Sequence, residues 1–201
     1  MIGPLLAVPT QNTRSDSMAK KIKGKPLMNA AEIDLALARI AAEIIEKLSP
    51  REEFGIIGIR RRGVHLAARL CRKLEAILTR PVLNGILDIT LYRDDLTTIA
   101  NRPMLRETSI DFDINNLSLI LVDDVLFTGR TIRAALDGLV DLGRPKRVQL
   151  AVLIDRGHRE LPIQADYVGK HVQTFDDESV EVLLNEEDHE ERVILVKMPS
   201  S

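Results

Sequence analysis

Asp123 and Asp124 are adjacent carboxylates that follow an apolar run and shortly precede a Thr-Gly-x-Thr sequence. The apolar run, residues 119–122, is typical of a strand buried on both faces of a parallel sheet. Ligands of open α/β sheets bind at the carboxyl ends of such strands. The turn at Thr128 would open a helix, where unpaired backbone N–H groups bind anions and Gly129 permits close approach. The segment therefore predicts a phosphate-binding turn with two acids beside it.

Two common phosphate motifs do not fit this turn. A P-loop requires G-x-x-x-x-G-K-[ST], whereas this turn has one glycine and no lysine. The dinucleotide-binding fingerprint also lacks its glycines. A ribose 5-phosphate would use both parts of the segment, because its hydroxyls lie away from the phosphate and donate well to ionised carboxylates. The plainer alternative is a pair of carboxylates that caps the following turn.

Apolar runs and helical spacing predict the elements that would position the turn. Expected strands are residues 54–59, 85–91, 118–123 and 147–154, with short strands at 165–168 and 193–197. Expected helices run from an Asn29 cap to just before Pro50, and over 64–78 and 128–142. This alternation indicates an α/β fold with a central parallel sheet flanked by helices. The polar stretch 92–116 is a long excursion, and its length suggests a functional role.

The size and composition of the chain favour one domain with an arm. It has 201 residues, of which 45% are hydrophobic and 29% are charged. We expect a mobile N-terminal arm over 1–28 and a single domain over 29–201, with Met1, Met18 and Met28 all possible starts. No run of about 18 apolar residues could span a membrane. Cys71 is the single cysteine, so no internal disulfide can form and a cytoplasmic setting is expected.

Charge is sorted along the chain, although the formal net charge is only -2. Residues 1–75 contain 14 Lys or Arg and 8 Asp or Glu, whereas residues 171–201 contain 2 and 9. A dedicated nucleic-acid-binding protein usually carries a basic excess, so the average argues against that class. The Arg60-Arg61-Arg62 turn after the first strand either offers forked donors to phosphate or is a solvated surface run.

Four motifs give the chain a family resemblance: residues 88–96 (DITLYRDDL), 122–131 (VDDVLFTGRT), 141–145 (DLGRP) and 150–162 (LAVLIDRGHRELP). Together and in this order they resemble the PyrR family of type I phosphoribosyltransferases, which are pyrimidine-operon attenuators and uracil phosphoribosyltransferases. The resemblance covers residues 29–197. It implies a twisted parallel sheet with a small hood at 155–180 and a flexible loop at 92–116.

The resemblance also implies roles for individual residues. Asp123 and Asp124 would hold the ribose hydroxyls of phosphoribosyl pyrophosphate (PRPP). With Arg61 and Arg93, which would neutralise the leaving pyrophosphate, they are the expected catalytic residues. Mg²⁺ is expected to arrive with PRPP and to reach protein acids through water, without a direct protein ligand. The further expected substrate-binding residues are Arg60, Arg62, Val125, Leu126, Phe127, Thr128, Gly129, Arg130, Thr131, Arg156 and Val180.

Phe127 bears on which base is transferred. Purine phosphoribosyltransferases resemble this turn but carry an aspartate directly before the Thr-Gly, where it exchanges a proton with the purine ring. A phenyl group cannot perform acid–base chemistry, so a purine substrate is disfavoured. The PyrR family usually has tyrosine there, and by resemblance the uracil slot involves Asp155, Arg156 and Gly157, with Val180 nearby. The predicted reaction converts uracil and PRPP to UMP and pyrophosphate.

The resemblance implies a second activity, the binding of pyrimidine-operon leader mRNA in the presence of UMP or UTP. Basic residues that remain on the implied face are Arg39, Lys47, Arg159 and Lys170. Other positions of that face have lost polar or basic residues, as at Ala42 and Gln164, or have gained acids at 176–178, which weakens phosphate neutralisation. We therefore expect a transferase first. The alternative is an RNA-binding attenuator with weak or absent catalysis, and a third possibility is another PRPP-dependent enzyme. By resemblance we also expect a homodimer or homotetramer.

Overall fold

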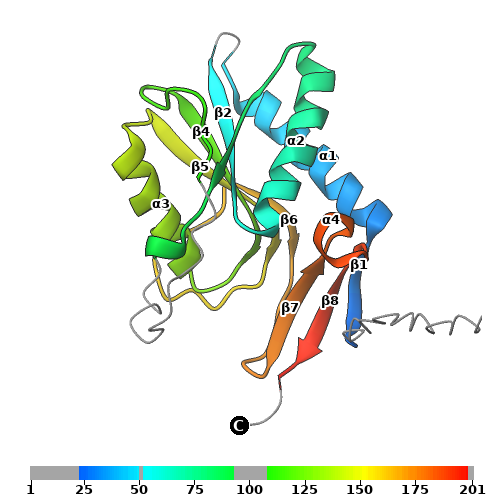
Figure 1. The fold of residues 1–201 in the computed structure, drawn as a ribbon. Helices are drawn as coiled ribbons and strands as arrows, with labels where there is room; N and C mark the ends of the chain where they lie inside the picture. Colours follow the sequence, from blue (N-terminus) through cyan, green and yellow to red (C-terminus); the bar gives the residue numbers. More distant parts are fainter. Residues whose placement is uncertain (1–22, 50–51, 93–107, 199–201) are drawn as a thin grey trace, which may run out of the picture.

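The computed structural model describes residues 23–49, 52–92 and 108–198, and its centre is a sheet of five parallel strands (Figure 1). The strand order is β3-β2-β4-β5-β6. The α/β class expected from the alternation of strands and helices is confirmed. The predicted residue Arg93 and most of the excursion 92–116 lie outside the described residues. The strands are β2 Phe54–Ile59, β3 Leu83–Leu87, β4 Ser118–Leu126, β5 Arg147–Asp155 and β6 Tyr167–His171.

Helices cover both faces of this sheet. The helices α1 (Ala30–Lys47) and α2 (Arg62–Leu78) lie on one face, and α3 (Arg130–Leu142) lies on the other (Figure 1). Successive side chains of a strand point to opposite faces, so Ile56 packs in the core with α1 and α2 while Ile57 packs in the core with α3. Burial on both faces explains why the strands read as continuous apolar runs.

The first helix begins as its sequence predicts. The side-chain Oδ1 of Asn29 accepts a hydrogen bond from the Glu32 amide at 3.0 Å, and Oε2 of Glu32 accepts one from the Asn29 amide at 2.8 Å. This reciprocal capping box satisfies a backbone donor at each position. The helix is thereby fixed at the point where the chain leaves β1.

A second, antiparallel sheet stands below the carboxyl edge of the large one, with the order β1-β8-β7 (Figure 1). Its strands are β1 Lys25–Asn29, β7 Glu178–Leu183 and β8 Arg192–Lys197, and the short helix α4 (Asn185–Asp188) joins the last two. Residues 25–28 of the arm predicted over 1–28 belong to β1, which pairs with β8. Of the segment 155–180 predicted as a hood, β6 belongs to the parallel sheet and the start of β7 to the antiparallel one. The domain bounds themselves stay a prediction.

The predicted and observed element bounds agree at β2 and differ elsewhere. The strand β4 continues to Leu126, past the predicted end at 123, because β5 is long enough to pair with it as far as Asp155. The strand β3 ends at Leu87, earlier than the predicted end at 91, and a 3-10 turn, η1 (Thr90–Tyr92), follows it. The helix α3 begins at Arg130 rather than at 128, so the Thr-Gly pair forms a turn of its own.

Two further findings concern the single cysteine and the length and apolar character of the described helices. Cys71 lies in the core on α2, and burial raises the pKa of its thiol to about 12, as suits a packing residue. Within residues 23–49, 52–92 and 108–198, none of the helices has the length and apolar character needed to cross a bilayer.

Candidate functional site

The two adjacent carboxylates lie near the end of β4, at the carboxyl edge of the parallel sheet. Asp123 is only 6% exposed, and its Oδ1 accepts a hydrogen bond from the Asp124 amide at 3.0 Å. Burial raises the pKa of Asp123 well above its usual range, and the charge of Asp124 raises it further. Burial also raises the pKa of Asp124, while the positive charge of Arg62 opposes that shift. Hydrogen-bond donors or a cation would therefore be needed to stabilise both charges.

The start of α2 packs directly against this pair because Gly63 has no side chain. A Cβ atom at Gly63 would lie 2.5 Å from the carbonyl oxygen of Val122 and 3.4 Å from Oδ1 of Asp123. The first distance is too short for a carbon atom, so a larger residue would push the helix away from β4. The basic turn that precedes Gly63 is thereby held beside the two acids.

The three arginines of that turn have different surroundings. Arg60 is half-buried, and its amide donates to the carbonyl of Leu87 at 3.0 Å, which ties the turn to β3. Arg61 is exposed. Arg62 donates from Nε and Nη2 to the two carboxylate oxygens of Asp188, at 3.1 and 2.8 Å. Of the three arginines predicted to bind pyrophosphate, Arg62 is thus already engaged by a protein acid.

The turn after β4 is supported from behind by the segment that follows β5. Gly129 has a φ of 93°, in the left-handed region that favours glycine, and it precedes the first residue of α3. The carbonyl of Thr128 accepts hydrogen bonds from the amides of Glu160 and Leu161, at 3.0 and 3.1 Å. The first N–H groups of a helix have no partner within the helix, so an anion placed before α3 would meet N–H donors.

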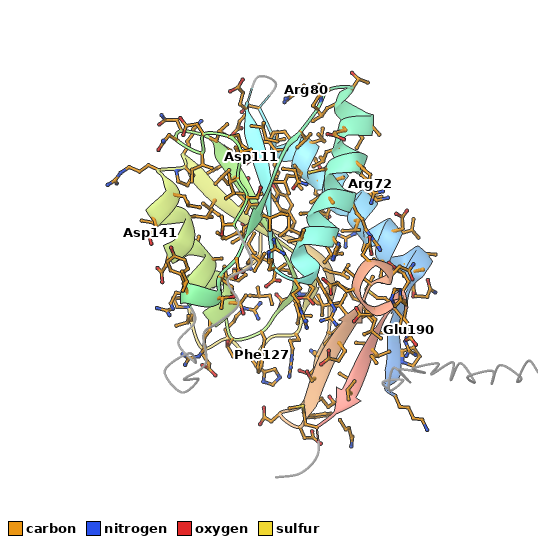
Figure 2. The ribbon with its side chains drawn as sticks, in the orientation of Figure 1. Arg72, Arg80, Asp111, Phe127, Asp141 and Glu190 are labelled. Atoms are coloured by element: carbon orange, nitrogen blue, oxygen red, sulfur yellow. The ribbon has the colours of Figure 1, made fainter. Side chains whose placement is uncertain are left out.

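An aromatic side chain and a buried cation lie next to this turn. Phe127 is 40% exposed and lies at the lower edge of the parallel sheet (Figure 2). The guanidinium of Arg156 stacks over the Phe127 ring, with 4.0 Å between Cζ and the ring centroid. Arg156 is 7% exposed, and its Nη2 donates to the Glu178 carbonyl at 2.5 Å while its Nε donates to Thr174 Oγ1 at 3.3 Å. Arg156 therefore connects β5 to β7, on which the predicted residue Val180 is buried.

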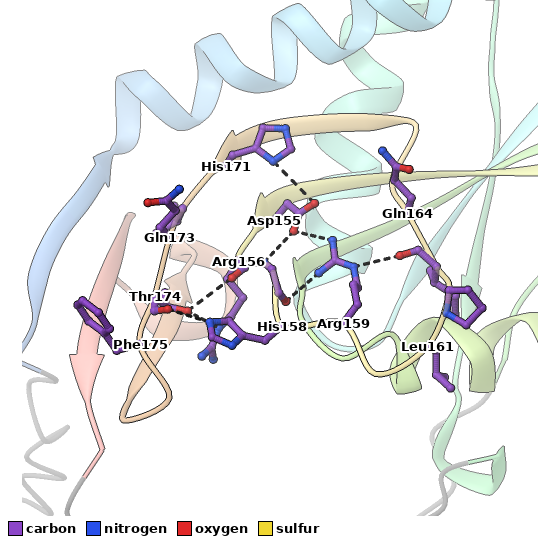
Figure 3. A pocket seen from close by; sticks show the side chains of 14 residues that line it. Asp155, Arg156, His158, Arg159, Leu161, Gln164, His171, Gln173, Thr174 and Phe175 are labelled. Carbon is purple, nitrogen blue, oxygen red and sulfur yellow. Dashed lines mark hydrogen bonds and ion pairs between the residues drawn. The ribbon is translucent and has the colours of Figure 1, made fainter.

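A hollow of about 1110 Å³ lies between the segments that follow β5 and β6 (Figure 3). Asp155 borders it, and its carboxylate accepts from Nη2 of Arg159 at 2.6 Å and lies 3.7 Å from Nδ1 of His171. Arg156 and Gly157 also line the hollow, whereas the acids of β4 are not among its lining residues. Asp155, Arg156 and Gly157, which were predicted for the uracil slot, thus line this hollow, whereas Val180 does not.

Arg159 connects the wall of the hollow to the turn after β4. Its guanidinium donates to the carbonyls of Phe127, Gly157 and Ile163, at 2.8, 2.9 and 3.0 Å, in addition to the carboxylate of Asp155. These contacts make Arg159 a brace between the segment after β5 and the turn after β4. The RNA-binding role expected of Arg159 stays a prediction.

The other three residues predicted to bind RNA lie where α1 and β1 meet the end of β6. Arg39, Lys47 and Lys170 are exposed, and each donates to main-chain carbonyls. The accepting residues are Val168 and Gly169 for Arg39, Asp166 for Lys47 and Leu27 for Lys170, at distances from 2.6 to 3.2 Å. Nη1 of Arg39 also forms an ion pair with Glu43 at 2.6 Å, which offsets part of its charge. The three side chains are exposed, and we group them as a small basic surface.

Sequence reasoning missed Asp188, which lies at the end of α4. It brings the segment between β7 and β8 into contact with the basic turn through its bond to Arg62. The sequence did contain a signal for this contact, because several acids follow residue 185 and cations recur on one face of α2. Nothing in the sequence, however, says that α4 lies beside the start of α2.

Within the described residues, no three His, Cys, Asp or Glu side chains are grouped so as to hold a metal ion. The two carboxylates of β4 nevertheless fit a Mg²⁺ ion that takes most of its ligands from water and substrate phosphates. Both have raised pKa values, and a nearby cation would favour their charged forms.

The sequence matches a family model described as a phosphoribosyl transferase domain over residues 27–187. It is 54% identical to the "Bifunctional protein PyrR" of Caldicellulosiruptor bescii over 176 residues, which cover 88% of this chain and 97% of that protein. It is 56% identical to the "Bifunctional protein PyrR" of Thermus aquaticus over 169 residues, which cover 84% of this chain and 93% of that protein.

Solved structures with the same fold are phosphoribosyltransferases. A ternary substrates complex of hypoxanthine phosphoribosyltransferase from Trypanosoma cruzi has a TM-score of 0.65 and 22% identity, covering 86% of this chain and 95% of that one. A hypoxanthine-guanine phosphoribosyltransferase from Bacillus anthracis has a TM-score of 0.66 and 20% identity, covering 87% and 99%. At these identities the likeness extends to the fold alone.

Proposed function

The chain belongs to the PyrR family of phosphoribosyltransferases, and we propose that it joins uracil to PRPP to give UMP and pyrophosphate. The observation that carries this proposal is the pair Asp123 and Asp124 at the end of β4, with the Thr-Gly turn and the start of α3 directly after it. This arrangement places acceptors for ribose hydroxyls and donors for a phosphate at one edge of the sheet.

Binding of the sugar phosphate would stabilise the negative charges of the buried acids. The ribose hydroxyls donate to Asp123 and Asp124, whose charged forms gain from each donor. The 5-phosphate occupies the turn of residues 125–131, where backbone N–H groups and the Thr128 hydroxyl face it and Gly129 leaves room. The substrate therefore supplies what the two carboxylates lack in the free protein.

The chemistry requires compensation of developing charge. Uracil N1 forms a bond to the anomeric carbon as the bond to pyrophosphate breaks, and the N1 proton is released. Positive charge develops on the ribose, which the carboxylates stabilise, and negative charge develops on the leaving group, which we assign to Arg61 to neutralise. Mg²⁺ bound through PRPP would add further neutralisation of the phosphates.

The base site favours a pyrimidine because it offers no acid or base at the position before the Thr-Gly turn. Phe127 and the Arg156 guanidinium form a stacked layer there, and the hydrogen bonds of Arg156 hold it in place. Uracil needs a flat slot with donors and acceptors, which the main chain of residues 155–157 and Val180 can supply. A purine that depends on proton exchange at Phe127 would lack its catalytic group.

A second function, nucleotide-dependent binding of pyrimidine-operon leader mRNA, is favoured by a specific observation. Four acids close to the C-terminus pair with arginines, namely Glu186, Asp188, Glu190 and Glu191, and Glu187 lies 3.3 Å from His65. Acids that are neutralised in this way repel an approaching RNA less than their number suggests. Arg39, Lys47 and Lys170 supply an exposed basic surface for the phosphates.

The transferase is tested by incubating the protein with PRPP, Mg²⁺ and each free base in turn, with pyrophosphate release as the readout. We expect release with uracil and none with purines. Replacing both acids (Asp123→Asn with Asp124→Asn) should lower UMP formation by about 100-fold or more while the fold is kept. The exposed acid substitution Asp177→Asn is the control. Release with a purine, or unchanged turnover in the double variant, would contradict the proposal.

The regulatory function is tested by filter binding of the leader RNA with and without UMP, at two salt concentrations. Retention should require UMP and should fall as salt rises, because phosphate contacts release counterions. The triple replacement of Arg39, Lys47 and Lys170 by glutamine should abolish retention without affecting UMP formation. Retention that is independent of UMP, or absent from the wild type, would count against this function.

A further inference from the structure

A cluster of ion pairs joins the start of α2 to the turn at α4. Arg62, His65 and Arg69 are spaced three and four residues apart, so they lie on one face of α2. Each meets an acid from residues 186–191, and we call this set the α2–α4 charge cluster. Its pairs are Arg62 with Asp188 (2.8 Å), His65 with Glu187 (3.3 Å), and Arg69 with Glu186 (2.6 Å) and with Glu191.

Of the cations in this cluster, Arg62 is the one whose charge acts on Asp124, and it is paired with Asp188. Two nitrogens of Arg62 bind two oxygens of Asp188, a forked arrangement that fixes the orientation of the guanidinium as well as its position. Both side chains are 20% exposed. Oδ2 of Asp188 also accepts from the Leu184 amide at 2.9 Å, so the carboxylate is itself held by the backbone of its own turn.

The positive charge of Arg62 acts on the acids of the proposed PRPP site. It directly precedes Gly63, whose backbone is packed against Val122 and Asp123, so the main chain at this point has little freedom to move. The charge of Arg62 favours the ionised form of Asp124. With the backbone fixed, the direction of the guanidinium depends on what binds it, and Asp188 provides that contact.

We propose that Asp188 is a positioning residue for phosphoribosyl transfer, which holds the Arg62 guanidinium beside Asp124. The turn between β7 and β8 then belongs to the working site although it contributes no group that touches the sugar. This inference rests on the proposed function, since PRPP is the ligand whose binding it explains. It goes further in assigning a role to a segment that the motifs of the family resemblance do not include.

The test compares three variants with the wild type: Asp188→Asn, Asp188→Glu and Glu190→Gln. Asparagine keeps one acceptor but loses the charge and the fork, whereas glutamate keeps both on a longer side chain. Glu190 lies beside α4 (Figure 2) and pairs with Arg192 rather than with α2, so Glu190→Gln removes a charge from the same turn as a control. The readouts are the separate KM values for PRPP and uracil, the melting temperature, and the affinity for MgPRPP by calorimetry.

We expect Asp188→Asn to lower kcat/KM for PRPP by about tenfold, the loss of one charge-assisted contact, and to leave KM for uracil within about twofold. Asp188→Glu should recover part of the loss, and Glu190→Gln should behave as wild type. A lower KM for PRPP in Asp188→Asn would show that Asp188 restrains Arg62 from the substrate, and this would overturn the proposal. So would unchanged kinetics, or equal losses for both substrates with a matching fall in melting temperature.

Calorimetry separates this inference from the proposed function. A wild type that binds MgPRPP but makes no UMP would refute the assignment of uracil as substrate, and the affinity of Asp188→Asn for MgPRPP would still decide the role of Asp188. A wild type that does not bind MgPRPP would overturn both.

Discussion

Replacement of Asp123 by asparagine should stabilise the folded chain while it removes transferase activity. Asp123 is 6% exposed and lies next to a second carboxylate, so folding without substrate buries a charge that nothing neutralises fully. Asparagine has a similar volume, and its Oδ1 can still accept the hydrogen bond that the Asp124 amide donates at 3.0 Å. The variant therefore loses the buried charge and keeps the contact.

The expected gain is about 1–2 kcal/mol in the free energy of unfolding, the range that relief of a functional constraint commonly gives. For a chain of this length, each kcal/mol raises the melting temperature by roughly 2–4 °C, so we expect a rise of about 2–8 °C. The hydrogen bond to Asp124 does not enter this difference, because both side chains can accept it.

The gain should depend on pH in a definite direction. The folded-state pKa of Asp123 is raised above the value of about 3.9 in an unfolded chain, so the folded state binds the proton more tightly. The wild type is therefore most stable, as far as this group is concerned, below about pH 3.9, and loses stability as the pH rises through the raised pKa. The advantage of Asp123→Asn should be smaller at about pH 4.5 than at about pH 7.5.

Thermal unfolding without ligands at both pH values measures this difference, and UMP formation is assayed on the same preparations. Asp177→Asn removes the same charge from an exposed position and serves as the control. A melting temperature at or below that of the wild type at the higher pH would refute the reasoning. An advantage of equal size at both pH values would do so as well, since the effect would then not come from the titration of Asp123.

Two further substitutions test the support of the site. Gly63→Ala should destabilise the fold by about 1–3 kcal/mol and impair UMP formation. The reason is that a Cβ atom 2.5 Å from the Val122 carbonyl oxygen would force α2 away from β4. An unchanged melting temperature would show that the contact relaxes without cost. Arg159→Ala should cost about 2 kcal/mol and raise KM for PRPP, because it removes the hydrogen bonds that hold the segment after β5 in shape and the one that ties it to the Phe127 carbonyl. Arg39→Ala, on α1, should leave KM unchanged, and equal effects of the two variants would disprove the bracing role of Arg159.

Local sequence signals predicted the parts of the fold that depend on short-range interactions. The capping box of Asn29 and Glu32 fixes the start of α1 with contacts three residues apart. The strand β2 was predicted with its observed bounds because its six residues are buried on both faces and therefore uniformly apolar. The position of Asp123 and Asp124 at the carboxyl edge follows from the same rule, applied to β4.

Pairing between distant segments could not be predicted in this way. The strand β1 pairs with β8, from the other end of the chain, and its sequence begins with Lys25 and Pro26, which suggest an exposed arm. The extension of β4 to Leu126 depends on its pairing with β5, which carries the ladder past the two acids to Asp155 and which the polar residues of β4 itself do not reveal. The roles of Arg62 and Arg159 likewise depend on partners more than 30 residues away.

The sorting of charge along the chain acquires a structural meaning from these distant pairs. Cations of α2 and acids of residues 186–191 are far apart in sequence, yet the fold brings them together as the α2–α4 charge cluster. The acids at 186–191 are therefore largely paired within the molecule, and their number overstates their repulsion of RNA, whereas Asp176 and Asp177 are exposed and lie outside the cluster. What an approaching RNA meets at α1 and β6 is the exposed surface of Arg39, Lys47 and Lys170. A net charge of -2 is thus compatible with both proposed functions. The salt dependence of RNA retention will report on this exposed basic surface rather than on the net charge of the whole chain.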